Sequence, residues 1–442
     1  ANFTQTMLIS CFSLTALADA HVSESEKILR ACVHCGFCTA TCPTYLLLGD
    51  EADSPRGRIY LIKDMLEEEK PATPQVVEHI DRCLTCLSCM TTCPSGVHYM
   101  HLVDHARAHI ARTYTRPLPD RLLRGMLAKV LPFPGRLRLA LRVATVSRPI
   151  RKWLANLPGG AQLAAMIELS SSFKRRRPTR RLPGATVDRP RGRVALLSGC
   201  AQQVLGQNIN EAAIRLLTRH GIEVVQPIDE GCCGALVQHL GYESRALDAA
   251  RHNVDVWTRE IENGGLDAIV VTTSGCGTVI KDYGFLLRND NAYAQKAVRI
   301  SALARDITEF LHELPLQDGV RTTGQVVAYH SACSMQHGQQ VRDQPKSLLR
   351  RMGFVVREVP EGHICCGSAG TYNVLQPEIA NRLRARKVTN IEKVKPQIIA
   401  SGNLGCITQI GAGTRIPVVH TVELVDWAMG GPLPDVLEGC LG

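Results

Sequence analysis

The hydrophobic pattern of the second half of the chain predicts strands that alternate with helices. Four short runs rich in Val, Ile and Ala have the length of buried strands; they are residues 194–197, 268–271, 326–329 and 397–400. Residues 214–225 and 348–356 each contain a helix-like segment, a turn at glycine and an apolar run. Because such alternation is typical of parallel α/β units, we predict two tandem α/β repeats, at 193–320 and 321–442.

The first part of the chain has a different periodicity. Residues 59–66 and 76–80 combine helical apolar spacing with helix-forming residues. We therefore predict an α-helical domain at 22–110. The fold class expected for the whole chain is α+β with several domains.

Residues 111–192 form a predicted helical connector between these parts. The stretch 101–193 holds 21 Lys or Arg residues against four acidic ones, whereas the whole chain has a net charge of +10. Its eight prolines between 117 and 183 favour short helices and loops. The basic surface is a solvated face, a docking site for an acidic partner or a peripheral contact with an anionic membrane. The run 174–177 lacks the stacking aromatic residues of nucleic-acid-binding segments, so we expect no nucleic-acid partner.

The amino-terminal residues predict neither a membrane span nor a leader. Residues 1–18 are uncharged but are interrupted by polar side chains. The apolar run at 7–12 and the small residues at 18–20 imitate a signal peptide, but no basic residues precede them. We expect a cytoplasmic protein, in peripheral contact with the inner face of the cell membrane if the connector binds there.

The number and spacing of the cysteines restrict the possible functions more than the overall composition does. With 442 residues, 45% of them hydrophobic and 21% charged, the chain has the composition of a globular protein of about three domains. Sixteen of its 18 cysteines fall into ordered groups. A secreted disulfide scaffold would be shorter and richer in cysteine. We interpret the groups as thiolate ligands in a reducing compartment.

Two copies of the motif C-x2-C-x2-C-x3-C-P lie in the predicted helical domain. In this motif three thiolates bind one 4Fe-4S cluster, while the fourth, beside a proline, ligates the other cluster. The first cluster is therefore assigned to Cys32, Cys35, Cys38 and Cys93. The second is assigned to Cys83, Cys86, Cys89 and Cys42. Zinc would instead favour paired knuckles over triplets, and His34 and His98 are expected to be neighbours rather than ligands.

A second set of cysteines repeats in the two α/β units, with a shift of 133 residues for its first members. Each copy has one cysteine, then 31 intervening residues, a Cys-Cys-Gly step, and a last cysteine after a predicted strand. The copies are Cys200, Cys232, Cys233 and Cys276, and Cys333, Cys365, Cys366 and Cys406. Ligands gather at the carboxyl ends of parallel strands, so each copy is a candidate iron-sulfur site. The competing interpretation is a set of structural thiols or a local redox disulfide. Gly234 and Gly367 predict a close backbone approach or a positive φ.

These motifs carry a family resemblance. The Cys-x31-Cys-Cys-Gly repeats resemble the cysteine-rich CCG domains of heterodisulfide reductase and related subunits. Joined to an α-helical two-cluster ferredoxin domain, they resemble the family of iron-sulfur subunits of glycolate oxidase. The matching stretches are 28–42, 55–62, 274–277 and 363–372.

The resemblance implies an electron-transfer subunit of an oxidoreductase complex. A partner subunit that contains FAD would oxidise glycolate, and this chain would pass the electrons to a quinone or another acceptor. No dinucleotide-binding fingerprint and no Ser-His-Asp arrangement is identifiable, so no catalytic residue is assigned. Similar parts occur in the iron-sulfur subunit of anaerobic glycerol-3-phosphate dehydrogenase and in lactate-utilisation proteins. Two further functions stay open, a heterodisulfide-reductase-like thiol/disulfide enzyme and a non-redox scaffold.

The repeats depart from one feature of their relatives. Relatives that bind a noncubane double cluster end each repeat in Cys-x-x-Cys, whereas Val279 and Gln409 occupy the last position here. A five-thiolate site is therefore excluded. A cluster in either repeat would be four-coordinate or would take another ligand, such as His330, His363 or His420, although histidines of this kind more often form hydrogen bonds.

Overall fold

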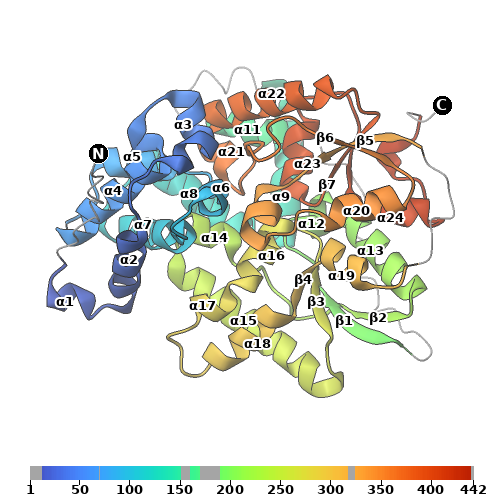
Figure 1. Cartoon of the computed structure of the whole chain (residues 1–442), viewed down its shortest axis with the longest axis horizontal. Coiled ribbons are helices and arrows are strands. Elements are labelled where there is room, and N and C mark those ends of the chain that lie inside the picture. Colours follow the sequence, from blue (N-terminus) through green and yellow to red (C-terminus); the bar gives the residue numbers. More distant parts are fainter. Residues whose placement is uncertain (1–11, 69, 151–159, 170–189, 317–323, 440–442) are drawn as a thin grey trace, which may run out of the picture.

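The computed structural model describes residues 12–68, 70–150, 160–169, 190–316 and 324–439. Figure 1 shows the helices of the amino-terminal part, in blue, beside two units that each contain a small sheet. This is the predicted α+β arrangement of a helical domain followed by two α/β repeats. Within the described residues, no helix has both the length and the apolar composition that crossing a bilayer requires.

Short helices surround one apolar core in the amino-terminal part. Leu29, Ile62 and Leu102 are fully buried in this core. Ser54 and Thr73 cap α4 and α5, and a proline follows each cap; these are the helices predicted at 59–66 and 76–80. The elements are α1 (Leu14–Leu17), α2 (Ala20–Ala31), η1 (Phe37–Thr41), α3 (Pro43–Leu48), η2 (Glu51–Asp53), α4 (Pro55–Glu67), α5 (Pro74–Asp81), α6 (Ser88–Thr92) and α7 (Tyr99–Thr113).

A basic helical segment follows this domain. Arg124 on α8 pairs with Asp81 at 2.8 Å, which holds α8 against the end of α5. A proline in the first turn starts both α8 and α9. The basic run predicted at 174–177 lies outside the described residues. The elements are α8 (Leu118–Val130), α9 (Pro134–Val146), η3 (Arg148–Ile150) and α11 (Gly160–Leu169).

Each α/β unit contains a four-stranded parallel sheet, with the orders β2-β1-β3-β4 and β6-β5-β7-β8. The four predicted strands are confirmed as the central strands β1, β3, β5 and β7, and the apolar runs after the two glycine turns are β2 and β6. The prediction missed β4 and β8, because three residues are too few for a strand signal. The strands are β1 (Gly192–Leu196), β2 (Ile222–Val225), β3 (Ala268–Val271), β4 (Ala304–Asp306), β5 (Val326–His330), β6 (Val355–Glu358), β7 (Ile398–Ser401) and β8 (Val418–His420).

The connecting helices follow the same order in both repeats, except that the first repeat has two additional helices between β3 and β4. The first repeat contains α12 (Gln202–Leu205), α13 (Gln207–Arg219), α14 (Ala235–His239), α15 (Glu243–Gly264), α16 (Ser274–Lys281), α17 (Tyr283–Leu286), α18 (Ala294–Leu303) and α19 (Ile307–Glu313). The second contains η5 (Ser334–Gln339), α20 (Gln344–Arg351), α21 (Tyr372–Leu375), α22 (Pro377–Lys393), α23 (Leu404–Gly411), α24 (Thr421–Ala428) and η6 (Asp435–Leu437).

The two repeats pack together through reciprocal contacts. Helix α13 of the first repeat packs against α24 of the second, and α20, the counterpart of α13, packs against α19, the counterpart of α24. Arg215 and Asp426 form an ion pair at 2.7 Å across the first contact. Because Leu196 of β1 and Tyr329 of β5 belong to one apolar core, the two sheets hold each other in a fixed relative position.

Candidate iron-sulfur sites

The two cysteine motifs of the amino-terminal domain form similar loops. In each loop the residues on both sides of the middle cysteine adopt left-handed backbone angles, which are φ 53° at His34, 83° at Gly36, 51° at Thr85 and 62° at Leu87. Such angles are uncommon and strained in residues other than glycine. The surrounding packing must hold both loops in this shape, which is the behaviour expected of a ligand-binding turn.

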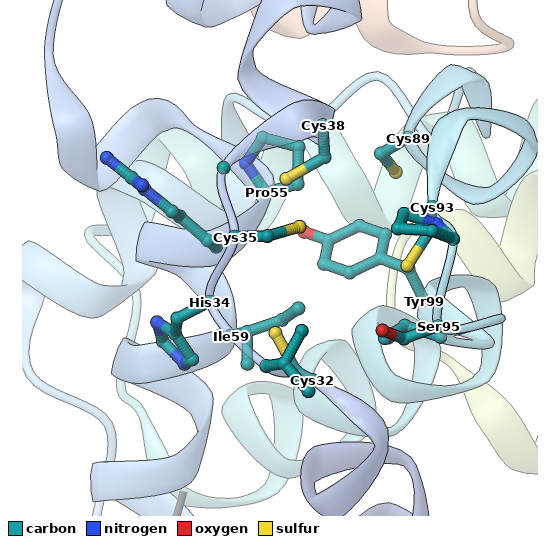
Figure 2. Close-up of a pocket in the computed structure, with 15 residues that line it drawn as sticks. Cys32, His34, Cys35, Cys38, Pro55, Ile59, Cys89, Cys93, Ser95 and Tyr99 are labelled. Atoms are coloured by element: carbon teal, nitrogen blue, oxygen red, sulfur yellow. The ribbon is translucent and has the colours of Figure 1, made fainter. Parts of the chain in front are cut away.

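Four thiols converge at the first predicted cluster site. Cys32, Cys35 and Cys38 line one cavity together with Cys93, which comes from the second motif. Figure 2 shows their sulfur atoms around a common space, with Cys89 at its edge. This convergence is consistent with the crossed assignment, and the role of these cysteines as ligands stays a prediction.

The second predicted set, Cys42, Cys83, Cys86 and Cys89, also lies together. The charge of Cys89 interacts with those of the other three. Burial, and then these neighbouring charges, raise the pKa of Cys89 well above its usual value. A cation that binds the thiolates offsets this cost, so the donor set suits a thiolate-ligated cluster.

Two buried donors contact the sulfur atoms of this second set. The guanidinium of Arg58 donates to Cys42 Sγ at 3.9 Å and to Asp53 Oδ1 at 3.1 Å. The hydroxyl of Tyr99 donates to Cys83 Sγ at 3.8 Å. Donors of this kind stabilise negative charge on sulfur and set the reduction potential of a cluster.

The cysteines of the first repeat form a chain of thiol contacts. Cys200 is hydrogen-bonded to Cys232, and Cys233 is hydrogen-bonded to both Cys232 and Cys276. Hydrogen bonds from Cys200 and Cys233 lower the pKa of Cys232 well below its usual value. Cys200 follows β1, and Cys276 lies on α16 after β3. The loops at the carboxyl ends of adjacent parallel strands therefore converge, as the sequence predicts.

The cysteines of the second repeat make the same contacts in the same order. Hydrogen bonds link Cys333 to Cys365, Cys365 to Cys366, and Cys366 to Cys406. The hydrogen bond to Cys365, and then burial, raise the pKa of Cys333 well above its usual value. All four thiols are buried. The donor set again fits a thiolate-bound cluster. In both repeats, the role of the cysteines as ligands stays a prediction.

The glycine of each Cys-Cys-Gly step confirms its predicted role. Gly234 has φ 89° and Gly367 has φ 87°. A Cβ atom would lie 3.1 Å from the carbonyl oxygen of Ala246 at the first position and 2.5 Å from that of Ala380 at the second. Glycine therefore allows each loop to press against the helix behind it, α15 or α22.

One of the three histidines proposed as additional ligands reaches a thiol set. A ring nitrogen of His330 and the sulfur atoms of Cys366 and Cys406 lie within 4.8 Å of one another. Burial, and then the charge of Lys387, lower the pKa of His330 well below its usual value. The imidazole is therefore neutral, which is the form that binds metals.

The other histidines have different surroundings. His420 accepts from the backbone N–H of Val422 through Nδ1, and its Nε2 lies 2.9 Å from the carbonyl oxygen of Thr272. His420 is therefore a capping group and not a free ligand. His363 is partly exposed. His34 lines the first cavity, and the His98 ring stacks on His101 with 3.9 Å between centroids.

The second cluster site adjoins the second repeat. The charge of Cys86 interacts with those of Cys333 and Cys365, and the three residues share one apolar cluster. The hydroxyl of Tyr372 donates to the carbonyl oxygen of Arg82 at 2.9 Å, directly before the second motif. Sequence reasoning misses this contact, because it joins different domains and no local pattern marks it.

The first repeat opens instead onto a large cavity. Cys200 and Cys232 line a space of about 550 Å³ together with Lys129, Phe133 and Arg136 of the α8–α9 segment. Helices α8 and α9 also leave apolar side chains exposed, at Leu118, Leu122, Leu139, Val143 and Val146. The sequence predicts a surface-lying basic segment here but not the cavity, whose walls come from two domains.

Two family models match the chain. The 4Fe-4S dicluster domain matches residues 28–97, and the cysteine-rich domain matches residues 194–281 and 327–411. The chain is thus an iron-sulfur protein with one two-cluster domain and a duplicated cysteine-rich domain.

Similarity to curated proteins narrows this class. The chain is 44% identical over 411 residues to the "Glycolate oxidase iron-sulfur subunit" of Escherichia coli (strain K12), which covers 93% of this chain and 97% of the relative. It is 29% identical over 427 residues to the "Probable glycolate oxidase iron-sulfur subunit" of Bacillus subtilis (strain 168), and the match covers 92% of this chain and 95% of the relative. The chain belongs to the family of glycolate oxidase iron-sulfur subunits, and it is therefore an iron-sulfur component of an oxidoreductase.

More distant matches agree with the architecture. "Lactate utilization protein A" of Bacillus licheniformis is 27% identical over 241 residues, which are 53% of this chain and 99% of that protein. Among solved structures, "Crystal structure of a hypothetical protein from Helicobacter pylori" has a TM-score of 0.54 at 11% identity and covers 95% of this chain and 74% of that one. The second similarity concerns the fold alone.

Proposed function

We propose that this chain relays electrons from a partner flavoprotein, which oxidises glycolate or a related 2-hydroxy acid, to a quinone. The observation that carries the proposal is the apolar cluster that contains Cys333 and Cys365 of the second repeat and against which Cys86 of the second motif packs. A relay needs redox sites that adjoin one another, and this cluster joins the two-cluster domain to the second repeat. The relatives named as glycolate oxidase subunits support the substrate class.

Four sets of thiols supply the ligands in this proposal. Two 4Fe-4S clusters are held by Cys32, Cys35, Cys38 and Cys93, and by Cys42, Cys83, Cys86 and Cys89. At least one further cluster is held by the repeats, through Cys333, Cys365, Cys366 and Cys406 or through Cys200, Cys232, Cys233 and Cys276. Such clusters, when bound, accept and release single electrons. The buried donors Arg58 and Tyr99 stabilise the added negative charge.

The cavity beside Cys200 and Cys232 is the proposed acceptor site. Phe133 offers an apolar wall to a quinone ring, and the Lys129 and Arg136 side chains on the same wall are donors for its carbonyl oxygens. Reduction takes two electrons from the relay and two protons from solvent, and it releases the quinol. FAD belongs to the partner subunit in this scheme, and the complex is a hetero-oligomer.

The segment around this cavity fits a membrane surface. Exposed apolar residues of α8 and α9 alternate with arginines, as in helices that lie on anionic lipid. We therefore propose a cytoplasmic protein bound to the inner face of the membrane through this segment.

The relay is tested on the complex purified anaerobically with its flavoprotein partner. Glycolate is added, and cluster reduction is followed by electron paramagnetic resonance while iron and quinol are measured. Cys93→Ser should remove the signal of one cluster, lower the iron content and slow quinol formation. Cys440→Ser, outside the ordered groups, is the matched control. Unchanged iron content and quinol formation in Cys93→Ser would contradict the proposal, and disulfide turnover by the chain alone would favour a thiol/disulfide enzyme.

Membrane binding is tested by flotation with vesicles that contain phosphatidylglycerol. The double variant Leu122→Glu/Val143→Glu should bind several-fold less than the parent protein. The double variant Ile228→Glu/Val298→Glu places the same two charges on exposed apolar positions outside α8 and α9, and it should bind like the parent. Equal binding by both variants would reject the α8–α9 segment as the contact.

A further inference from the structure

His330 is buried, yet its imidazole has no hydrogen-bond partner within the described part of the chain. It is the last residue of β5, three positions before Cys333, and its exposed fraction is 1%. Neither Nδ1 nor Nε2 has a partner among the described residues. A buried polar group without a partner costs about 1–3 kcal/mol, and such groups are rare in native proteins. The orphaned imidazole is therefore available to a group that is not part of the protein.

The surroundings of His330 identify the kind of ligand. One ring nitrogen lies within 4.8 Å of the sulfur atoms of Cys366 and Cys406. Gln409, the nearby polar residue at the position where some relatives carry a fifth cysteine, is satisfied by other protein groups: it accepts from Asn373 at 3.1 Å and donates to the carbonyl oxygen of Ala380 at 3.2 Å. Within the described residues, the group of side chains here that could hold a metal is therefore His330 with Cys366 and Cys406.

The first repeat lacks this donor. Leu197 occupies the position equivalent to His330, three residues before Cys200, and it is buried in the apolar core of its repeat. The thiol contacts are otherwise the same in both copies. The two sites therefore differ in one donor atom, although they share one repeated pattern.

We propose that His330 is a nitrogen ligand of the cluster held by the second repeat, which gives that cluster a mixed thiolate and imidazole donor set. This inference rests on the proposed presence of a cluster in the second repeat. Replacing thiolate by imidazole raises the reduction potential of an iron-sulfur centre. The second repeat would then attract electrons from the adjoining cluster at Cys86, and electrons would travel from the two-cluster domain into the repeats.

The ligand is detected by pulsed electron paramagnetic resonance on the full chain, purified anaerobically from cells fed 15N-histidine. Spectra are taken after oxidation and after reduction by dithionite. A strong coupling of a cluster to histidine nitrogen is expected. The coupling should vanish in His330→Leu, which copies the first repeat, and it should persist in His363→Leu, the matched control near Cys365. His330→Cys offers a sulfur donor and should retain the iron while it loses the coupling.

Three results overturn the proposal in distinguishable ways. Iron near the roughly eight atoms that two 4Fe-4S clusters supply would reject a cluster in the repeats, and His330 ligation with it. Iron above that count without nitrogen coupling would reject His330 alone and leave the relay intact. Coupling that survives in His330→Leu and His330→Cys would assign the nitrogen to another histidine.

Discussion

The phenolic oxygen of Tyr99 lies 3.8 Å from the sulfur atom of Cys83. Tyr99 is the first residue of α7, the helix that follows the second motif, and its side chain is buried. It also lines the cavity formed by the first set of thiols. One side chain therefore contacts both predicted cluster sites and donates to the sulfur of the second.

Tyr99→Phe should lower the reduction potential of the second cluster. The change removes a donor that stabilises the reduced, more negative state. A loss of about 1 kcal/mol corresponds to roughly 40 mV for a one-electron couple. Redox titration followed by electron paramagnetic resonance measures the shift. Tyr60→Phe, on an exposed tyrosine of α4, should leave both potentials in place, and equal potentials in Tyr99→Phe and the parent would refute the expectation.

Arg58→Met should destabilise the amino-terminal domain. Arg58 is buried and pairs with Asp53, which is also buried, so the variant leaves a buried carboxylate short of a cation. Breaking a buried pair costs about 3–5 kcal/mol, and we expect about 3 kcal/mol because Arg82 still pairs with Asp53. Anaerobic urea unfolding measures the loss.

Arg30→Met is the control for Arg58→Met. Arg30 forms a pair with Glu26 on the surface of α2, and its side chain is 60% exposed. Exposed pairs contribute less than about 1 kcal/mol. Similar losses in the two variants would show that burial does not govern the contribution of Arg58.

Local patterns predicted much of this molecule, and contacts between domains account for what they missed. The spacing of Cys32 to Cys93 and the apolar runs of the central strands are short-range signals, so they are visible in the sequence. The approach of Cys86 to Cys333 depends on how domains dock, and nothing near either residue in the chain encodes it. The three candidate histidines also look alike in sequence. Only packing separates His330, beside thiols, from His420, which caps a helix.

Gly367→Ala should lower the free energy of unfolding more than a glycine-to-alanine substitution at another left-handed position does. The new Cβ would lie 2.5 Å from the carbonyl oxygen of Ala380, and φ is 87°. Strain of this kind costs about 1–3 kcal/mol before any clash, so we expect a loss of at least about 2 kcal/mol. Gly430→Ala has φ 93° but open space around the Cβ, and it isolates the backbone contribution. Equal unfolding free energies for the two variants would exclude a close-packing role for Gly367.

Asp104 links stability to pH. Burial raises its pKa to about 7, and its Oδ2 accepts from Gln238 Nε2 at 2.8 Å between α7 and α14. An unfolded aspartate has a pKa of about 3.9. From about pH 4 to pH 7 the folded state therefore binds more protons than the unfolded state, and the contribution of Asp104 to stability falls as pH rises.

Asp104→Asn should remove that pH dependence, because the amide stays neutral and keeps an acceptor for Gln238. Relative to the variant, the free energy of unfolding of the parent protein should fall by up to about 1.4 kcal/mol per pH unit between pH 4 and pH 7. Above pH 7 the difference in unfolding free energy between the two proteins should become constant. Urea unfolding at pH 5, 6, 7 and 8 measures it. Asp343→Asn replaces a carboxylate that is 90% exposed, and its unfolding free energy should depend on pH as that of the parent does. A difference between parent and Asp104→Asn that stays constant from pH 5 to pH 7 would mean that Asp104 is already ionised in the folded protein, because only a proton retained by the folded state produces the slope.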